Sequence, residues 1–490
     1  MVSAAAGTGK TAVLVGRIMG HLKDPVNPID INRLLVVTYT NAAAAEMRER
    51  IRAELASEIS RNPESMHLRR QMILLNDACI ATMHSFCLDV VREHFYMVGL
   101  DPAFRLADET EAELLQLEVL EALLEEKYAG GDASFFALVD LYGGERDDEG
   151  LKELVLKLFR FSRSLPCPGD WLRQVAGEWA KQVESIDAYA WCEELKQGIG
   201  LEIGGCIEEI KRAIALCLKP GGPVAYIDNL KQDLKMLGSL SSLCKRSWAE
   251  LGEGFDGASF AGLKPLRKKD GIRSELQEQV KTIRDQVKKR IDSIRKTVFS
   301  RTPEQQANDM RRMAPVVEAL IGLVSEFGER YRGAKERRSV LDFSDLEHYC
   351  LRILSREDEG CDRFTPSSIA LEFRERFVEI LVDEYQDINA VQEAILNLIS
   401  KQEAKRSSIF MVGDVKQSIY RFRLAEPGLF LEKYHRYPRQ ADNGERRIDL
   451  KQNYRSRDRV IEAVNYLFGQ IMAPGVAEMK YGGESELVPG

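Results

Sequence analysis

The stretch Ala4-Ala5-Ala6-Gly7-Thr8-Gly9-Lys10-Thr11 decides the predicted fold, and an apolar run that begins at Ala12 follows it directly. Its two glycines let the backbone curl so that successive N–H groups face a phosphate. The helix predicted to begin here, and to continue to about Leu22, directs its positive end to the same place. Lys10 can reach the β- and γ-phosphates of a nucleotide, and the Thr11 hydroxyl can ligate Mg²⁺.

The general form of this motif has glycine where this chain has Ala4. A turn of small residues before a buried helix is therefore the alternative. Gly-x-Gly-Lys-Thr at the start of a helix still favours a nucleotide-binding loop. Such a loop normally follows a buried strand, and only Met1, Val2 and Ser3 precede it here, so we expect a truncated N-terminus.

The composition is that of a soluble globular protein, with 44% hydrophobic and 30% charged residues among 490. This length predicts about two to four domains. The formal net charge of -8 argues against a surface that is basic throughout, but it leaves room for a local basic groove. No apolar run approaches membrane-spanning length, so no membrane association is expected. The nine cysteines form no Cys-x-x-Cys pair, and their odd number without a signal peptide predicts reduced thiols and a cytoplasmic protein.

Two buried strands are predicted after the first helix, and polar and aromatic residues follow each of them. The strand 33–38 ends in Thr38, Tyr39, Thr40 and Asn41, ahead of an alanine-rich helix. The strand 78–82 leads to His84, Ser85 and Phe86. Ligands bind at the carboxyl ends of parallel strands, so these residues are candidates for a phosphate or a base. A helix cap and a core aromatic are the alternatives for Ser85 and Phe86, and His84 is not predicted to be catalytic.

The region 101–336 is predicted to be an α-helical insertion in an α/β domain. Asp108 with Glu111 marks a helix start, and leucines then recur at helical spacing. The segments 264–269 and 281–296 are locally basic, which leaves a nucleic-acid patch open. Acidic residues are interleaved in the second segment, so a solvated helix face with ion pairs is favoured.

The α/β part resumes near Asp342, and the strand 378–382 then delivers Asp383 and Glu384 at its carboxyl end. Asp383 can hold Mg²⁺, and Glu384 can orient and deprotonate an attacking water. An acidic strand cap is the alternative. The presence of a phosphate loop in the same chain favours nucleotide hydrolysis.

A further strand, 408–412, leads to Gln417, which is placed to sense a γ-phosphate. Tyr420 and Phe422 alternate with Arg421 and Arg423, a pattern that suits stacked bases and a paired phosphate backbone. A strand with a buried aromatic face is the alternative. The strand 448–450 then leads to Asn453-Tyr454-Arg455-Ser456 and to a helix from Asp458.

In this order the segments resemble the motifs of superfamily 1 DNA helicases of the UvrD/Rep/PcrA type, whose phosphate loop begins with alanine, as at Ala4. The resemblance pairs residues 38–41 with motif Ia, 82–86 with motif Ib, 383–387 with motif II, 412–423 with motif III and 453–456 with motif IV. More narrowly, Ala107–Glu111 and Leu341–Leu346 resemble AddA, the helicase-nuclease subunit family of the bacterial AddAB complex.

The resemblance implies a role for each candidate residue. ATP and Mg²⁺ would bind Ala4, Ala5, Ala6, Gly7, Thr8, Gly9, Lys10 and Thr11, with Thr11 and Asp383 at the metal. Glu384 would be the base, Gln417 and Arg455 would contact the γ-phosphate, and Tyr454 would stack on the adenine. DNA would contact Thr38, Tyr39, Asn41, His84, Ser85, Phe86, Tyr420 and Phe422.

The chain departs from the family pattern at several places. Tyr39 and Ala42 stand where motif Ia usually has phenylalanine and lysine, and Arg423-Leu424-Ala425 stands where motif III often ends in Arg-Gly-Ala. The glutamine motif, motifs V and VI and a nuclease domain are not found, so we expect an N-terminal part of a longer product.

The resulting expectation is a RecA-like P-loop NTPase domain with a large helical insertion and the start of a second RecA-like domain. The predicted boundaries are 1–100 and 337–425 for the first domain, 101–336 for the insertion and 426–490 for the second domain. The expected function is ATP-driven 3′-to-5′ movement on single-stranded DNA in break repair, and the further partners expected are duplex DNA and a nuclease subunit of the AddB type. A fragment that binds ATP and DNA without turnover, and an ATPase acting on proteins, are the alternatives.

Overall fold

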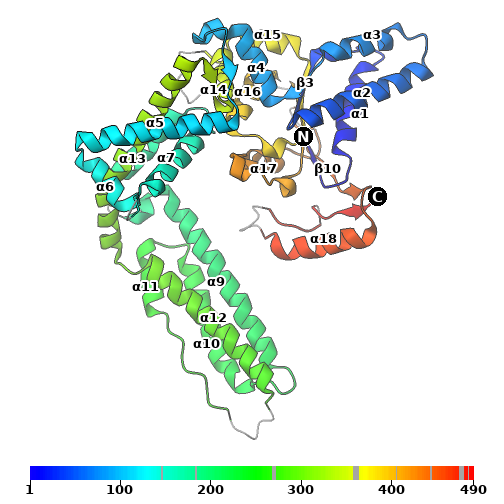
Figure 1. The fold of residues 1–490 in the computed structure, drawn as a ribbon. Helices are drawn as coiled ribbons and strands as arrows, with labels where there is room; N and C mark the ends of the chain where they lie inside the picture. Colours follow the sequence, from blue (N-terminus) through cyan, green and yellow to red (C-terminus); the bar gives the residue numbers. More distant parts are fainter. Residues whose placement is uncertain are drawn as a thin grey trace. The chain divides into compact units, whose positions relative to one another are not determined.

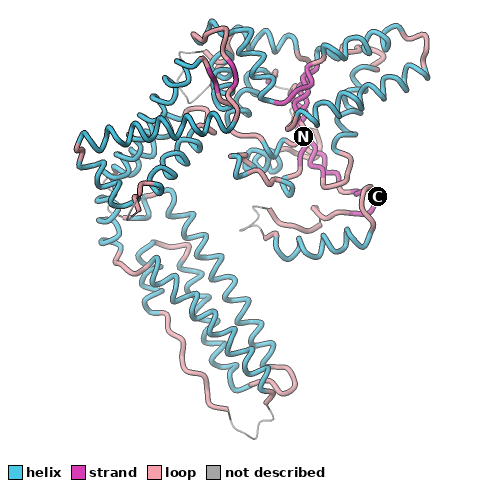
Figure 2. Tube along the Cα trace, viewed as in Figure 1, coloured by secondary structure: helices cyan, strands magenta, loops and turns pink. Residues whose placement is uncertain are grey.

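A computed structural model describes residues 1–144, 147–181, 185–266, 272–356, 364–403, 406–441, 444–473, 479–483 and 485–490 (Figure 1). The chain forms two compact units. The α/β unit consists of Met1–Arg173 and Leu320–Gly490, and the helical unit consists of Gln174–Ala319. Figure 2 shows the strands gathered in the α/β unit, whereas the described part of the helical unit is made of helices and loops.

The α/β unit is built on a six-stranded sheet in the order β10-β1-β9-β6-β2-β3. Every neighbouring pair is parallel. The strands are β1 (Val2–Ala4), β2 (Leu34–Thr38), β3 (Cys79–Thr82), β6 (Glu379–Val382), β9 (Ile409–Gly413) and β10 (Ile448–Leu450). Each predicted strand is present within a residue or two, and the α/β prediction is confirmed.

Helices cover both faces of this sheet, which explains why its strands are almost continuously apolar. Leu34 and Val36 pack on one face and Leu35 and Val37 on the other, because side chains alternate along a strand. The first face carries α1 (Lys10–Leu22), α2 (Asn41–Arg61) and α3 (Met66–Leu74). The second face carries α4 (Met83–His94), α14 (Phe343–Leu354), α15 (Ser368–Arg376), α16 (Ala390–Ile399) and α17 (Pro427–Arg436).

The strand β10 lies beyond residue 426, the predicted start of the second domain, and belongs to the same sheet as β1. Ile448 and Leu450 pair with Val2 and Ala4, so this strand completes the edge of the first domain's sheet. With β9 on its other side, the short strand β1 therefore has a hydrogen-bonding partner on each side, and the local sequence does not reveal the pairing with β10. Beyond it lie β11 (Gln452–Asn453), α18 (Asp458–Ile471) and β12 (Val488–Pro489), and β11 pairs with β12.

The compact helical unit is shorter than the predicted insertion 101–336. The helices α5 (Glu109–Gly130), α6 (Ala133–Tyr142) and α7 (Glu149–Ser162) belong to the α/β unit, whereas α8 (Pro168–Ala180) and α13 (Pro303–Arg338) cross the division. The predicted start of α5 is confirmed, because the Asp108 side chain accepts a hydrogen bond from the Glu111 N–H (2.8 Å). The short strands β4 (Arg105–Leu106) and β5 (Val340–Leu341) pair in parallel beside it.

The helical unit contains α9 (Ala190–Cys217), α10 (Ile227–Leu243), α11 (Trp248–Gly257) and α12 (Ser274–Val298), which lie alongside one another (Figure 1). The arginines of the basic segment on α12 form ion pairs within this unit. Arg284 is buried and pairs with Asp233 (2.6 Å), and Arg295 pairs with Asp292 (2.9 Å). These pairs fit the favoured interpretation as a helix face with ion pairs. In the other basic segment, 264–269, residues 267–269 lie outside the described chain.

The start of α14 is held by a cluster of charged side chains. Asp342 and Asp345 form a capping box there, and Lys335 pairs with both carboxylates. Arg163 pairs with Asp345 (3.2 Å). In the next turn, the His348 Nε2–H donates to the Arg163 carbonyl oxygen (2.9 Å). Burial, and then the positive charge of Arg163, lowers the pKa of His348 to about 4.

We expect His348 to make the α/β unit less stable in mild acid. The unfolded chain takes up this proton near pH 6.5, whereas the folded chain resists it until about pH 4, so stability falls as the pH falls through that window. The expected loss between pH 7 and pH 5 is about 2 kcal/mol. Urea unfolding of the parent and of His348→Gln at both pH values checks this, since the variant should lose correspondingly less. Equal pH dependence of the two proteins would contradict it.

Across the described residues, no helix combines the length and apolar character that crossing a bilayer demands.

Candidate nucleotide and nucleic-acid site

The predicted phosphate loop lies between β1 and α1, at the carboxyl edge of the sheet. Gly7 and Gly9 have positive φ angles of 71° and 88°, which glycine adopts without strain. The Thr8 hydroxyl donates to the Ala5 carbonyl oxygen (2.7 Å) and closes the turn. Helix α1 begins at Lys10, so its first N–H groups face the loop as the sequence predicts. Thr11 is half-buried in the first helical turn.

Lys10 meets residues from two other strand ends at this edge. Its Nζ donates to Glu384 Oε2 (2.6 Å) and to Gln417 Oε1 (3.0 Å). The predicted lysine thus contacts the predicted base and the predicted phosphate sensor directly, although it lies 374 and 407 residues from them in sequence. Their catalytic roles stay predictions.

The acidic strand end concentrates negative charge. Burial, and then the charge of Glu384, raises the pKa of both Asp383 and Asp387 to about 6. Glu384 itself has a left-handed backbone with φ 49°, a strained conformation for a residue with a side chain. Within the described chain, Asp387 Oδ1 is buried without a hydrogen-bond partner. A set of hard oxygen atoms with excess negative charge fits Mg²⁺, and Asp383 with Thr11 would hold it.

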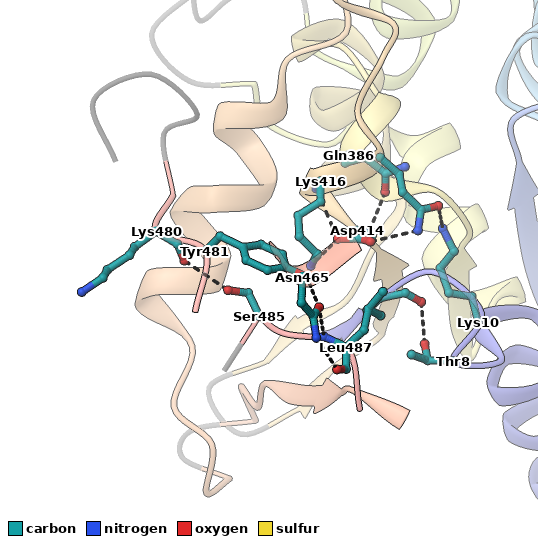
Figure 3. A network of polar contacts seen from close by, with 12 residues as sticks. Thr8, Lys10, Gln386, Asp414, Lys416, Asn465, Lys480, Tyr481, Ser485 and Leu487 are labelled. Atoms are coloured by element: carbon teal, nitrogen blue, oxygen red, sulfur yellow. Dashed lines mark hydrogen bonds and ion pairs between the residues drawn. The ribbon is translucent and has the colours of Figure 1, made fainter. Parts of the chain in front are cut away.

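A second layer of polar residues supports this edge. These residues lie within the segments that resemble motifs II and III, but the sequence predicted no role for them. Gln386 is fully buried and donates to Glu384 Oε2 (2.8 Å), and its own Oε1 accepts the Asp414 N–H (2.9 Å). Asp414 accepts from Gln417 (2.9 Å) and pairs with Lys416 (2.7 Å), as Figure 3 shows around Lys10. The signal was present, because both Gln386 and Asp414 follow closely after buried strands.

The segment that follows β10 touches the phosphate loop. The Asn453 side chain is buried; its Nδ2 donates to the Ala6 carbonyl oxygen (2.7 Å), and its Oδ1 accepts the N–H groups of Arg455 and Ser456. The Tyr454 N–H donates to the Gly7 carbonyl oxygen (3.0 Å). A Cβ atom on Gly7 would come within 2.7 Å of the Asn453 side chain, so glycine is required there for space as well as for φ. The predicted Tyr454 and Arg455 therefore lie beside the loop, both exposed.

We expect Asn453→Ala to weaken ATP binding about tenfold, because it removes hydrogen bonds worth about 1 kcal/mol each from the loop's support. Titration with a fluorescent ATP analogue measures the change. Asn465→Ala is the matched control, since Asn465 makes three similar hydrogen bonds with Leu487 and Tyr481. Unchanged ATP affinity in Asn453→Ala would show that the loop is held without it.

Aromatic side chains gather at the same edge of the sheet. The rings of Tyr39 and Tyr420 stack at a centroid distance of 4.6 Å, and Phe422 lies 5.9 Å from Tyr420. The Arg423 guanidinium lies over both Tyr420 and Phe422. Phe422 is 75% exposed, so the alternative of a buried aromatic face does not hold for it. The cluster offers ring faces and a cation, which suit bases and phosphates.

The other predicted DNA contacts have different surroundings. Thr38 is buried and donates to the Thr40 carbonyl oxygen (3.1 Å), and Asn41 is exposed at the start of α2. Thr82 caps α4 by accepting the Ser85 N–H (3.2 Å), and its hydroxyl meets that of Ser85 (2.9 Å). His84 is partly exposed and pairs with Glu347 (3.1 Å).

The predicted contact between Phe86 and DNA is wrong. Phe86 is buried and packs edge-on against Phe373 in the core beneath the sheet. It lies in the first turn of a helix whose inner face is apolar, and the alternative of a core aromatic is correct. Motif position alone did not distinguish an inward from an outward side chain.

Comparisons with known proteins agree with this geometry. Residues 1–438 match the family model described as UvrD/REP helicase N-terminal domain. Similar proteins, each named as the A component of an ATP-dependent helicase/nuclease, come from Pelotomaculum thermopropionicum (51% identity), Geobacillus thermodenitrificans (47%) and Bacillus licheniformis (45%). These matches cover 99–100% of this chain and 39% of each relative.

Proposed function

Because the chain belongs to the UvrD/Rep helicase family, we propose that it is the part of a DNA helicase that binds and hydrolyses ATP and grips single-stranded DNA. The resemblance to the AddA family is confirmed by the relatives, and the parallel sheet agrees with a RecA-like helicase fold. The chain spans about two-fifths of the length of those relatives.

One observation carries the proposal: the segment 414–423 touches both parts of the site. Gln417 contacts Lys10 beside the phosphate loop, and three residues later Tyr420 stacks on Tyr39. A change in the nucleotide at Lys10 can therefore move the aromatic cluster with little intervening structure. A motor needs such an arrangement, since ATP turnover has to change the affinity for DNA.

The chain's own residues suit phosphoryl transfer to water. The loop N–H groups and Lys10 bind the phosphates, and Gln417 orients the γ-phosphate. Glu384 accepts the proton of the attacking water, and Lys10 offsets the charge that develops. Thr11 and Asp383 would hold Mg²⁺, which would offset the negative charge of the phosphates. Arg455 contacts the γ-phosphate from the segment after β10, and Tyr454 stacks on the adenine.

The relatives' names describe the A component of an ATP-dependent helicase/nuclease, and this supports a proposal about the wider role. We propose 3′-to-5′ movement on single-stranded DNA ahead of a duplex, in double-strand break repair in the cytoplasm. A nuclease subunit of the AddB type is the proposed partner.

Oligo-dT binding, followed by fluorescence anisotropy at low salt, tests the DNA part of this function. Tyr420→Ala and Phe422→Ala should each weaken binding about fivefold or more, because a stacked base contributes about 1–3 kcal/mol. Tyr466→Ala is the matched control for Phe422→Ala, since Tyr466 on α18 is an aromatic residue of similar exposure. Binding that is unaffected by both cluster variants would contradict the proposed DNA site.

A further inference from the structure

The buried carboxylate of Glu347, on α14, lies at the centre of a polar network outside the ATP site. His84 Nε2 pairs with Glu347 Oε1 (3.1 Å), Gln392 Nε2 donates to the same oxygen (2.6 Å), and Asn389 Nδ2 donates to Oε2 (2.9 Å). Burial alone would raise the pKa of Glu347, but the hydrogen bonds, that of His84 foremost, lower it below its usual value. The carboxylate is therefore charged at neutral pH, and both of its oxygens are engaged.

His84 stands at the edge of the sheet where DNA is proposed to bind. It lies in the first turn of α4, directly after β3, and the ends of β3 and β2 are in register through Thr82 and Thr38. The His84 side chain is 40% exposed. The ring of Phe343 packs edge-on against it at 5.2 Å, and Phe343 is 47% exposed. A large apolar side chain left open to solvent beside a half-exposed imidazole offers a base a surface to stack on.

Two features fix this pair in place. Phe343 and Glu347 belong to the first two turns of α14, whose start is held by the Lys335 and Arg163 contacts described above. Asn389 is the N-cap of α16 and follows Asp387 by two residues, so Glu347 also joins the pair to the segment that carries Asp383 and Glu384. One buried charge thus connects α4, α14 and α16.

The geometry points to a second DNA-contact surface formed by His84 and Phe343, with Glu347 as the positioning residue that orients His84 and ties it to α16. This inference rests on the proposed function and adds two residues to it, Phe343 as a contact with single-stranded DNA and Glu347 behind the contact. Glu347 itself touches no DNA and acts through His84.

The test uses the 490-residue chain and its variants His84→Ala, Phe343→Ala, Glu347→Gln and the His84/Glu347 double variant. Two quantities are measured, the dissociation constant for oligo-dT and the oligo-dT concentration that half-saturates ATP hydrolysis. Each single variant should raise both about fivefold or more. The double variant should bind oligo-dT about as tightly as whichever of its two single variants binds less tightly, because the two residues act as one unit.

Glu379→Gln is the matched control. Glu379 is also a buried glutamate paired with a histidine, His21 (2.7 Å), but it lies at the amino end of β6, at the opposite edge of the sheet. Its replacement should leave both DNA quantities unchanged. A loss of folded protein would lower the maximal rate without moving the half-saturating concentration, so the two effects are separable.

The inference would be overturned if Glu347→Gln bound oligo-dT with parental affinity. It would also be overturned if the increases in the dissociation constant caused by His84→Ala and Glu347→Gln multiplied in the double variant. Either result would leave the proposed function standing. If Phe343→Ala bound oligo-dT with unchanged affinity, Phe343 would not be a DNA contact and that part of the inference would be overturned. A parent chain that does not bind oligo-dT would overturn the proposed function and this inference together.

Discussion

Lys10→Ala is expected to reduce ATP hydrolysis about a thousandfold or more, because Lys10 supplies the positive charge at the point where phosphate charge develops. Its Nζ lies 2.6 Å from Glu384 and 3.0 Å from Gln417, so it faces both the proposed base and the proposed phosphate sensor. The lysine is also largely enclosed, which strengthens its electrostatic effect. Phosphate release at saturating ATP measures the loss.

Lys23→Ala is the matched control for this experiment. Lys23 follows the last residue of α1 and pairs with Glu58 (3.1 Å). The substitution therefore removes a lysine at the end of the same helix that is far from the phosphate loop. Its rate should stay that of the parent. Hydrolysis at the parental rate by Lys10→Ala would mean that the loop does not hold the reacting phosphates.

Glu384→Gln is the second variant with a large expected effect, and it should separate binding from chemistry. The glutamine keeps the shape of the side chain but cannot take a proton from water, so hydrolysis should fall about a hundredfold to ten-thousandfold. ATP affinity should remain within a few-fold of the parent, because the loop and Lys10 are intact. A fluorescent ATP analogue and phosphate release, measured on the same preparation, give the two values.

Glu379→Gln makes the same substitution at the other end of β6, where the carboxylate pairs with Arg17 and His21 instead of facing Lys10. Its hydrolysis rate should remain close to that of the parent. If Glu384→Gln hydrolysed ATP normally, the water would have to be activated by another group, and the assignment of Glu384 as base would fail.

The local pattern of the sequence was sufficient for β2, β3, β6, β9 and β10, for α1 and for the residues that meet at the sheet edge, but it did not predict β1. Glu384 and Gln417 follow buried strands, and Lys10 belongs to the phosphate loop. Because parallel strands share a carboxyl edge, these residues indicate a ligand site there. The structure brings these three side chains together. The sequence resemblance to the UvrD/Rep family is likewise confirmed.

Features that depend on distant pairing could not be predicted in this way. The membership of β10 in the first sheet depends on Val2 and Ala4, more than 440 residues earlier. The support that Asn453 gives to Ala6 depends on the same long-range contact. Phe86 shows that a motif position can also mislead. Its position in the motif indicated a DNA contact, whereas it lies on the buried face of α4 and packs in the core.

The most direct measurement is ATP hydrolysis by the 490-residue chain, with increasing oligo-dT at low salt, where phosphate contacts are strongest. Coupling between Gln417 and the Tyr39–Tyr420 stack predicts that DNA raises the rate about tenfold or more, a typical coupling between two sites. Retained binding of both ATP and oligo-dT without any stimulation would contradict this, and would mean that the chain binds nucleotide and DNA without acting as a motor.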